Sequence, residues 1–230
     1  PLAGLRMQAD LAQREGTSTE ELKKSLQQIG RSSIRATHTV NQLLALARAE
    51  GGAAVVQRQK IDLARLVIDV VQDSVPRAMD KHIDLGYDGA DPGTPGVGME
   101  GNPTLLKELV RNLVDNAINY TPSGGGQPGM VTVRVLPETF AHVVLFQVED
   151  SGPGVPESER ELVFQPFYRA LGNEADGSGL GLPIVLEIAR QHGATITMED
   201  AHPGQTPPGI CFSVRFNARE APVPEQHSAG

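Results

Sequence analysis

The chain has 230 residues, of which 39% are hydrophobic, and it carries a formal net charge of -8. This length and apolar content fit one large or two small domains with a real core, and they argue against global disorder. An acidic chain with scattered Lys and Arg also argues against a nucleic-acid partner, because phosphate binding needs clustered positive charge.

Other features of the composition bear on compartment and membrane. The single cysteine, Cys211 in the apolar run GICFSVRF, excludes an internal disulfide framework and is expected to be a small core residue. This cysteine usage suits a reducing cytosol. No apolar run approaches the ~20 residues of a membrane span, and no signal peptide is recognisable. The chain begins at Pro1 inside a helical pattern, so we expect it to be a fragment.

Residues 1–50 carry the pattern of two helices. The first is expected to end at Gly16, and Ser18 followed by Glu21 forms a capping box that opens a second helix running to about Glu50. The seam of the second helix steps by four and three, as in a heptad: Leu22, Leu26, Ile29, Ser33, Ala36, Val40, Leu43 and Ala47. We expect this antiparallel hairpin to dimerise into a four-helix bundle, because a second hairpin would bury the seam. A hairpin folded back onto the same chain is the alternative.

The rest of the chain divides into a linker at 51–56, a domain at 57–217 and a disordered tail at 218–230. In the domain, helices are predicted at 63–79, 104–121 and 180–192. Strands are predicted at 57–62, 83–87, 131–136, 143–150, 195–198 and 210–216. Because strands and helices segregate, the pattern predicts an α+β two-layer sandwich rather than a doubly wound sheet.

The helix predicted at 104–121 is apolar around most of its circumference but has one polar stripe. Glu108, Asn112, Asn116 and Tyr120 follow one another at intervals of four, which keeps them on one face. Buried carboxylates and amides need hydrogen bonds or a cation. The stripe therefore indicates either an occupied cavity or an ordinary solvated face, and this helix alone does not decide between them.

Two glycine clusters flank a long segment with little predicted regular structure. Asp150, Gly152 and Gly154 directly follow a strand, in a pattern that is often only a turn. The second cluster contains a helix start, where backbone N-H groups and the helix dipole can hold an anion. Its residues are Gly177, Gly179, Leu180 and Gly181. It matches neither a P-loop nor a dinucleotide-binding fingerprint. The segment between the clusters has the features of a lid: Phe164, Pro166, Phe167, Tyr168 and Arg169.

These motifs, in this order, resemble those of sensor histidine kinases of two-component systems. Their N, G1, F and G2 boxes are similar to the stripe on 104–121, the Asp150 turn, the Phe164 to Arg169 segment and the second glycine cluster. The opening PLAGLRMQADLA is similar to the sequence after the phospho-accepting histidine in H-E-x-R-T-P-L, so the resemblance covers nearly the whole chain. Within this family, the residues of the motifs are similar to those of kinases of the quorum-sensing and tricarboxylate-transport sensor group. The resemblance implies the Bergerat ATP-binding fold of the GHKL superfamily, a mixed sheet with helices on one face.

The resemblance also implies a role for each motif residue. Glu108 and Asn112 would be the catalytic pair that approaches a Mg²⁺ bridging the triphosphate of ATP, an oxygen-rich setting that suits this ion. Asn116 would bond the phosphates or the sugar, Tyr120 would pack on adenine, and Asp150 would accept from the adenine amino group. The remaining nucleotide-binding residues would be Gly152, Gly154, Arg169, Gly177, Gly179, Leu180 and Gly181.

Two departures from the family pattern bear on function. Asn119 stands where a basic residue often reaches the phosphates, so phosphate affinity is weaker or Arg169 or another group supplies the charge. The acceptor histidine would lie five residues before the proline of H-E-x-R-T-P, upstream of Pro1, so we expect this chain not to autophosphorylate. No other histidine is expected to replace it, because His38 lies off the heptad seam and His192 sits at a helix end, where a His suits the dipole.

The resemblance thus implies the catalytic part of a membrane-anchored sensor kinase, on the cytoplasmic side of the inner membrane. The whole protein would dimerise through the hairpin and pass the γ-phosphoryl of Mg-ATP through a histidine to an aspartate of a response-regulator receiver domain. Its membrane anchor would lie in N-terminal segments absent from this sequence. One alternative is a GHKL-type ATPase that hydrolyses ATP, and another is a nucleotide-binding dimerisation module without transfer activity.

Overall fold

The computed structural model describes residues 20, 22–26, 29–30, 58–123, 128–169 and 178–218. The chain divides into two compact units, Pro1–Arg48 and Ala49–Gly230. In the first unit the described residues are helical, as the heptad pattern predicts, and Lys23 Nζ lies 3.4 Å from a Glu20 carboxylate oxygen. The pairing of the predicted hairpin, the linker at 51–56, Gly177 and the tail beyond Ala218 lie outside the described residues. None of the helices that are described has the length and apolar character needed to cross a membrane.

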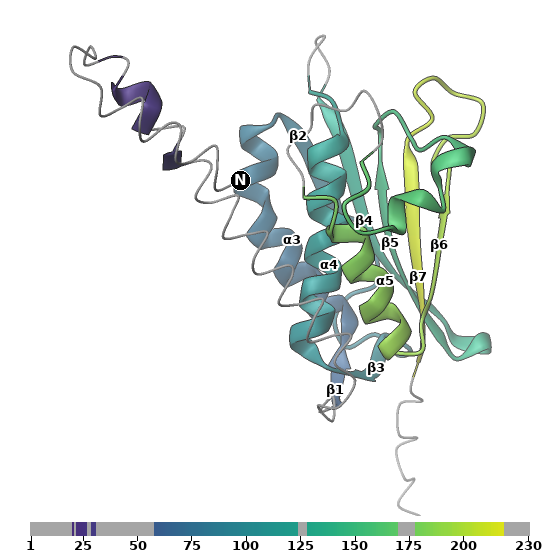
Figure 1. The fold of residues 1–230 in the computed structure, drawn as a ribbon. Coiled ribbons are helices and arrows are strands. Elements are labelled where there is room, and N and C mark those ends of the chain that lie inside the picture. The colour runs from purple at the N-terminus through teal and green to yellow at the C-terminus, as the bar shows by residue number, and fades with distance from the viewer. Residues whose placement is uncertain are drawn as a thin grey trace, which may run out of the picture. The chain divides into compact units, whose positions relative to one another are not determined.

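The second unit is built on a five-stranded mixed sheet in the order β2-β4-β5-β7-β6 (Figure 1). β2 runs parallel to β4, and the other neighbouring pairs in this sheet are antiparallel. Val144, Phe146 and Val148 of β5 are buried while the residues between them are half-buried, because successive side chains of a strand point to opposite faces of the sheet. The strands are β2 (Ile83–Tyr87), β4 (Gly129–Glu138), β5 (Val143–Asp150), β6 (Thr195–Glu199) and β7 (Ile210–Asn217).

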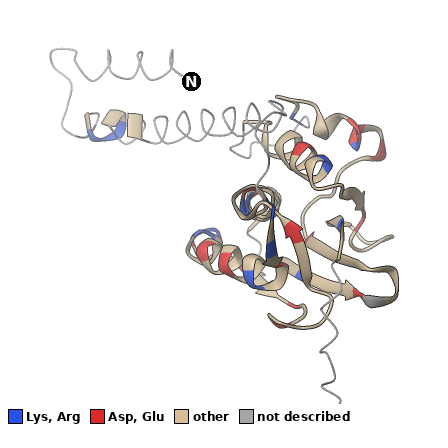
Figure 2. Cartoon of the chain, turned by 90° about the horizontal axis from the view of Figure 1, so that it is seen from below, with Lys and Arg blue, Asp and Glu red and all other residues tan. Residues whose placement is uncertain are grey.

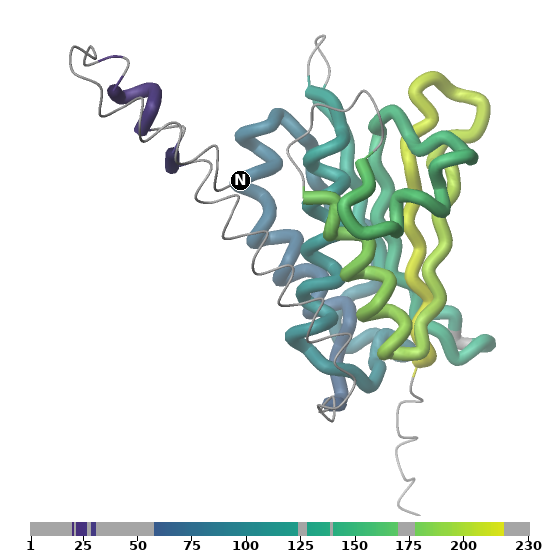
Figure 3. The backbone as a smooth tube through the Cα atoms, in the orientation of Figure 1, coloured from purple at the N-terminus to yellow at the C-terminus, as the bar shows by residue number. Residues whose placement is uncertain are grey.

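Three helices lie side by side over one face of this sheet (Figures 1 and 3). They are α3 (Leu63–Asp80), α4 (Pro103–Tyr120) and α5 (Gly181–Gln191), and short 3-10 turns lie at η1 (Thr139–Ala141), η2 (Glu157–Glu159) and η3 (Leu162–Phe164). The core fills the space between the helices and the sheet, with Leu109 and Leu113 of α4 and Ile184 and Ile188 of α5 almost fully buried. The predicted α+β two-layer sandwich, with a mixed sheet and helices on one face, is confirmed.

A second, two-stranded sheet differs from the prediction. β1 (Gln59–Asp62) lies within the strand predicted at 57–62, but its antiparallel partner β3 (Gly98–Gly101) was not predicted. The sequence of β3, GMEG, has two glycines in four residues and therefore little strand propensity of its own. Pairing with a strand from far back in the chain overrides this local preference.

The two ends of α4 are fixed by side chains. Asn102 Oδ1 accepts the backbone N-H groups of Thr104 (3.0 Å) and Leu105 (3.1 Å), and Pro103 follows at the first helical position. At the other end Lys81 Nζ donates to the Asn119 carbonyl (3.1 Å). The cap satisfies N-H groups that a helix leaves unpaired, and the cation complements the negative end of the helix dipole. Together these contacts hold α4 in place along its axis.

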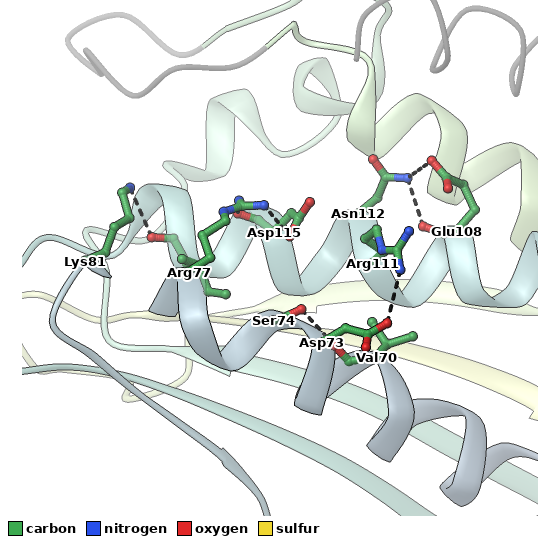
Figure 4. A network of polar contacts seen from close by, with 10 residues as sticks. Val70, Asp73, Ser74, Arg77, Lys81, Glu108, Arg111, Asn112 and Asp115 are labelled. Carbon is green, nitrogen blue, oxygen red and sulfur yellow. Dashed lines mark hydrogen bonds and ion pairs between the residues drawn. The ribbon is translucent and has the colours of Figure 1, made fainter. Parts of the chain in front are cut away.

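Ion pairs at a constant spacing join α3 to α4, so the two helices run parallel; Figure 4 shows the pairs Asp73–Arg111 and Arg77–Asp115. The pairs are Asp69–Lys107 (3.7 Å), Asp73–Arg111 (3.5 Å) and Arg77–Asp115 (2.6 Å). Asp69–Lys107 and Asp73–Arg111 are exposed, and pairs of that kind contribute only about 0.2–1 kcal/mol each. Their effect on α4 is therefore mainly orientation: the helix turns its charged side to α3 and its polar stripe away from it.

Candidate functional site

The polar stripe of α4 is not an ordinary solvated face. Asn112, in the middle of the stripe, is only 5% exposed, and Glu108, Asn116 and Tyr120 are half-buried. The Asn112 Nδ2 amide donates to the Glu108 carbonyl (2.8 Å) and to Glu108 Oε1 (3.1 Å), as Figure 4 shows. These bonds leave the amide oxygen of Asn112 directed toward a different element, the start of α5.

Gly181, the first residue of α5, packs directly on the two asparagines of the stripe. A Cβ added at Gly181 would lie 3.2 Å from Asn112 Oδ1 and 3.3 Å from both side-chain polar atoms of Asn116. This separation is tighter than ordinary van der Waals contact, so a side chain here would push the amides away. The structure therefore brings together residues of the first and last motifs, with a helix N-terminus above two amides.

We predict that Gly181→Ala weakens nucleotide binding about tenfold, because the added methyl group displaces the Asn112 and Asn116 amides by a few tenths of an ångström. Alanine is favoured over glycine in a helix, so the free energy of unfolding should change by less than about 1 kcal/mol. Calorimetric titration with ATP measures the affinity. Gly86→Ala is the matched control, since a Cβ there meets no atom within 4 Å. Equal affinities for the two variants would contradict the prediction.

Asp150 ends β5 and is only 5% exposed. Its Oδ1 accepts the Gly152 N-H (2.8 Å), and a Cβ at Gly152 would lie 3.2 Å from the Tyr120 carbonyl. The Asp150 turn therefore lies against the C-terminal end of α4. Burial raises the pKa of Asp150 to about 6, although hydrogen bonds from Gly152 and Ile210 act in the opposite direction; the charge of Glu149 raises it further. Such a buried acceptor suits recognition of an amino group.

Glycine is required at two other motif positions by the backbone. Gly154 has φ +75° and lies against Pro208, and Gly179 has φ +71°. A Cβ at Gly179 would lie 2.8 Å from the backbone of Phe167, which donates its N-H to the Gly179 carbonyl (2.8 Å). Phe167 itself has φ +65° and its side chain is 62% exposed. The predicted lid segment and the second glycine cluster are thus held together at these two residues.

Two other predicted site residues differ in burial: Leu180 is buried and Arg169 is exposed. The Leu180 side chain is fully buried, so a ligand could contact only its backbone, and the Leu180 N-H donates to Ser178 Oγ (3.2 Å). Arg169 is exposed in the lid segment. Across the described residues, His, Cys, Asp and Glu form no group of three that could hold a metal ion by themselves. A cation at Glu108 and Asn112 would thus need oxygens from a ligand as well.

One buried polar residue of this region was missed in the sequence. Thr121 follows Tyr120 and is 3% exposed, and its Oγ1 has no hydrogen-bond partner among the described parts of the chain. Its Cα would lie 3.6 Å from a Cβ at Gly152, so it belongs to the same end of α4 as Asp150. An unpaired buried hydroxyl costs about 1–3 kcal/mol. No motif marks it, because its burial depends on glycines distant in the sequence.

The residues present fit a nucleotide with its metal. Glu108 and Asn112 supply oxygens of the kind that Mg²⁺ prefers. Gly181 gives a close approach to backbone N-H groups at a helix start, where a phosphate is favourably bound. Asp150 supplies a buried acceptor at the other end of the stripe. The arrangement has one end suited to an anion and one end with a buried acceptor, joined by one helix.

Comparison with known proteins identifies the family of this chain. Residues 101–220 match the family of histidine kinase-, DNA gyrase B- and HSP90-like ATPases, and residues 1–52 match the His Kinase A (phospho-acceptor) domain. The sensor protein kinase PmrB of Pseudomonas aeruginosa is 37% identical over 197 residues, covering 85% of this chain and 39% of PmrB. The chain thus spans about two fifths of the length of this relative.

Two solved structures share the fold. The mycobacterial sensor histidine kinase MprB is 28% identical with a TM-score of 0.60, covering 71% of this chain and 99% of that one. Full-length ShkA in complex with AMPPNP is 26% identical with a TM-score of 0.69, covering 97% of this chain and 44% of that one. The chain therefore belongs to the histidine kinase-, DNA gyrase B- and HSP90-like ATPase family and, within it, to the sensor histidine kinases.

Proposed function

We propose that this chain binds Mg-ATP between α4, the Asp150 turn and the start of α5. The whole protein would transfer the γ-phosphoryl group to a histidine, for relay to an aspartate of a response-regulator receiver domain. The observation that carries the proposal is the close packing of Gly181 on the Asn112 and Asn116 amides, which forms an anion site at a helix start. The similarity to ShkA, which was solved in complex with AMPPNP, supports nucleotide binding.

Each motif residue has a role in this proposal. When bound, Mg²⁺ neutralises charge on the triphosphate. Glu108 and Asn112 hold their oxygens toward the metal end, and their mutual hydrogen bond fixes both side chains. Asn116 bonds the phosphates or the sugar. Asp150 accepts from the amino group of the base, against which Tyr120 packs. Catalysis of this kind depends on positioning and electrostatics more than on covalent chemistry by the protein.

The backbone and the lid complete the proposed site. Gly177, Gly179, Leu180 and Gly181 would offer N-H groups to the phosphates, and Gly152 and Gly154 would let the chain turn beside the base. Arg169 would supply positive charge in place of the basic residue that Asn119 replaces. This charge lies on the lid segment, so it would reach the phosphates only when the lid approaches them.

The proposal extends to assembly and location. Residues 1–50 would dimerise as a helical hairpin, and a receiver domain would dock on the full protein. The catalytic part would lie on the cytoplasmic side of the inner membrane, anchored through other segments of the longer protein. No nucleic-acid partner is expected, because acidic and basic residues are interspersed along the described helices (Figure 2).

The direct test uses γ-labelled ATP and the 230-residue chain. We expect calorimetry to detect Mg-dependent ATP binding. We also expect no acid-labile label on the protein, because the chain contains no H-E-x-R-T-P sequence. Acid-labile label on the chain would contradict the second expectation. Steady release of phosphate without any acceptor would instead favour the ATPase alternative, and absence of binding would overturn the proposed site.

A further inference from the structure

His192 joins the two helices of the proposed nucleotide site at the end remote from the motifs. It follows α5 directly and is only 7% exposed. Its Nδ1 lies 2.8 Å from the Ile188 carbonyl, and its Nε2 accepts the backbone N-H of Asn102 (3.0 Å). Since Ile188 offers only an acceptor and Asn102 only a donor, the ring is the neutral tautomer with its proton on Nδ1.

The Asn102 bond connects this ring to the start of α4. Asn102 is the cap of α4, and its side chain accepts the N-H groups of Thr104 and Leu105 while its own backbone N-H goes to His192. Gly101 makes room for the ring, because a Cβ there would lie 2.9 Å from His192 Cδ2. A continuous chain of hydrogen bonds therefore runs from the last turn of α5 to the first turn of α4.

The lengths of α4 and α5 connect the His192–Asn102 contact to the proposed nucleotide site. From Asn102 to Asn112 α4 advances roughly 15 Å, and from Gly181 to His192 α5 covers roughly 16 Å at 1.5 Å per residue. The helices therefore lie antiparallel with two matched contacts, His192 on Asn102 and Gly181 on Asn112. If α5 slid along α4 by one turn, both contacts would be lost together.

We propose that His192 is a positioning residue that sets the register of α5 against α4 and thereby holds Gly181 opposite Asn112 and Asn116. The proposal rests on the nucleotide-binding function proposed above. In the neutral form the ring both donates and accepts. A protonated ring would present an N-H to the Asn102 N-H, and the hydrogen bond between His192 and Asn102 would be lost.

The surroundings of His192 favour the neutral ring. Burial lowers its pKa, the bond to Ile188 acts in the opposite direction, and the charge of Arg58 lowers it further. Arg58 also donates to the Gln191 carbonyl (2.9 Å) at the end of α5. The other charged groups on the neighbouring elements are paired or exposed: Glu187 with Arg190, Lys107 with Asp69, and Lys60 and Glu100 at the surface. The sequence placed a histidine here as a complement to the helix dipole. In the structure the His192 ring is neutral and makes two hydrogen bonds.

Two variants separate the roles of the ring nitrogens. In His192→Gln the side-chain oxygen can take the place of Nε2 and accept from Asn102, whereas the shorter amide of His192→Asn reaches only the position of Nδ1. We expect His192→Asn to raise the Kd for ATP about tenfold and His192→Gln to change it by less than about threefold. A purely structural role would lower the urea midpoint of both variants without separating their affinities.

The second measurement uses the unaltered chain, so it does not depend on the variants folding. Coupling between the two contacts is reciprocal, so saturating ATP should slow hydrogen exchange of the Asn102 amide severalfold, although this amide is roughly 15 Å along α4 from Asn112. Equal affinities in folded Asn and Gln variants, or unchanged exchange at Asn102 with ATP bound, would overturn the inference. If the unaltered chain bound no ATP, the proposed function would fail instead.

Discussion

Adenosine is expected to bind this chain about tenfold more weakly at pH 5 than at pH 7, because Asp150 is then mostly protonated. Its pKa is raised to about 6 by burial, so one pH unit below that value only about a tenth of the molecules keep the carboxylate that accepts from the base. Calorimetry with adenosine measures this directly, since the phosphates of ATP titrate near the same pH.

The control for this pH effect is Asp150→Asn. We expect the variant to bind adenosine weakly at both pH values. Its amide does not titrate, and its single oxygen cannot accept hydrogen bonds from the base, Gly152 and Ile210 at the same time. His192→Gln should keep the pH dependence of the unaltered chain. Equal affinity of the unaltered chain at pH 5 and pH 7 would show that Asp150 does not read the base.

The same carboxyl group affects stability with the opposite sign. Its pKa in the folded chain lies above the ordinary value of about 3.9, so the native state binds more protons than the unfolded state between about pH 4 and pH 6. The free energy of unfolding therefore decreases as the pH rises through this window, by up to about 3 kcal/mol for this group. A charge kept buried for recognition makes the fold less stable at neutral pH.

His192 makes the free energy of unfolding depend on pH in the opposite direction. Its pKa is lowered in the folded chain, so the stability from the neutral ring is fully present above about pH 6.5, the ordinary value, and decreases as the pH falls below it. The unfolding curves of the unaltered chain report the sum of the two effects. The Asp150→Asn and His192→Gln variants separate them.

The sequence predicted the elements that have their own periodicity and missed features that depend on contacts between distant residues. β5 was predicted at its observed bounds because its sequence, VVLFQVED, is rich in valine and other residues that favour strands. β3 was missed because its pairing with β1 outweighs its glycines. The stripe on α4 left two alternatives open, because the contact of Gly181 with Asn112 joins two motifs that are distant in the sequence.

The same limit applies to charge states. Sequence position placed His192 at a helix end, but its hydrogen bond from the Asn102 N-H and its packing against Gly101 involve residues that are distant in the chain. The Asp150 motif was visible, while its raised pKa follows from burial beneath a turn closed by the Gly209 N-H on the Gly152 carbonyl (3.0 Å). Local patterns identify these residues, and tertiary packing determines their chemistry.

Asn112→Ala is expected to lower the affinity for Mg-ATP by at least about a hundredfold, on the order of 3 kcal/mol. The substitution removes the amide oxygen beside Gly181 and also the donor that holds Glu108 Oε1. The fold should persist, because the lost side-chain hydrogen bonds, about 1 kcal/mol each, are partly offset by the higher helix propensity of alanine. Calorimetry with Mg²⁺ and with a chelator measures the metal-dependent part of the loss.

Arg111→Ala is the matched control, since Arg111 is the preceding residue of α4 but faces α3, where it pairs with Asp73. We expect it to bind Mg-ATP as the unaltered chain does and to lose no more than about 1 kcal/mol of stability. Unchanged affinity in Asn112→Ala would remove this residue from the site. Because Asn112 holds Glu108, combining Asn112→Ala with Glu108→Ala should cost less than the sum of the two single losses. Additive losses would instead mean that the two side chains act on the nucleotide independently.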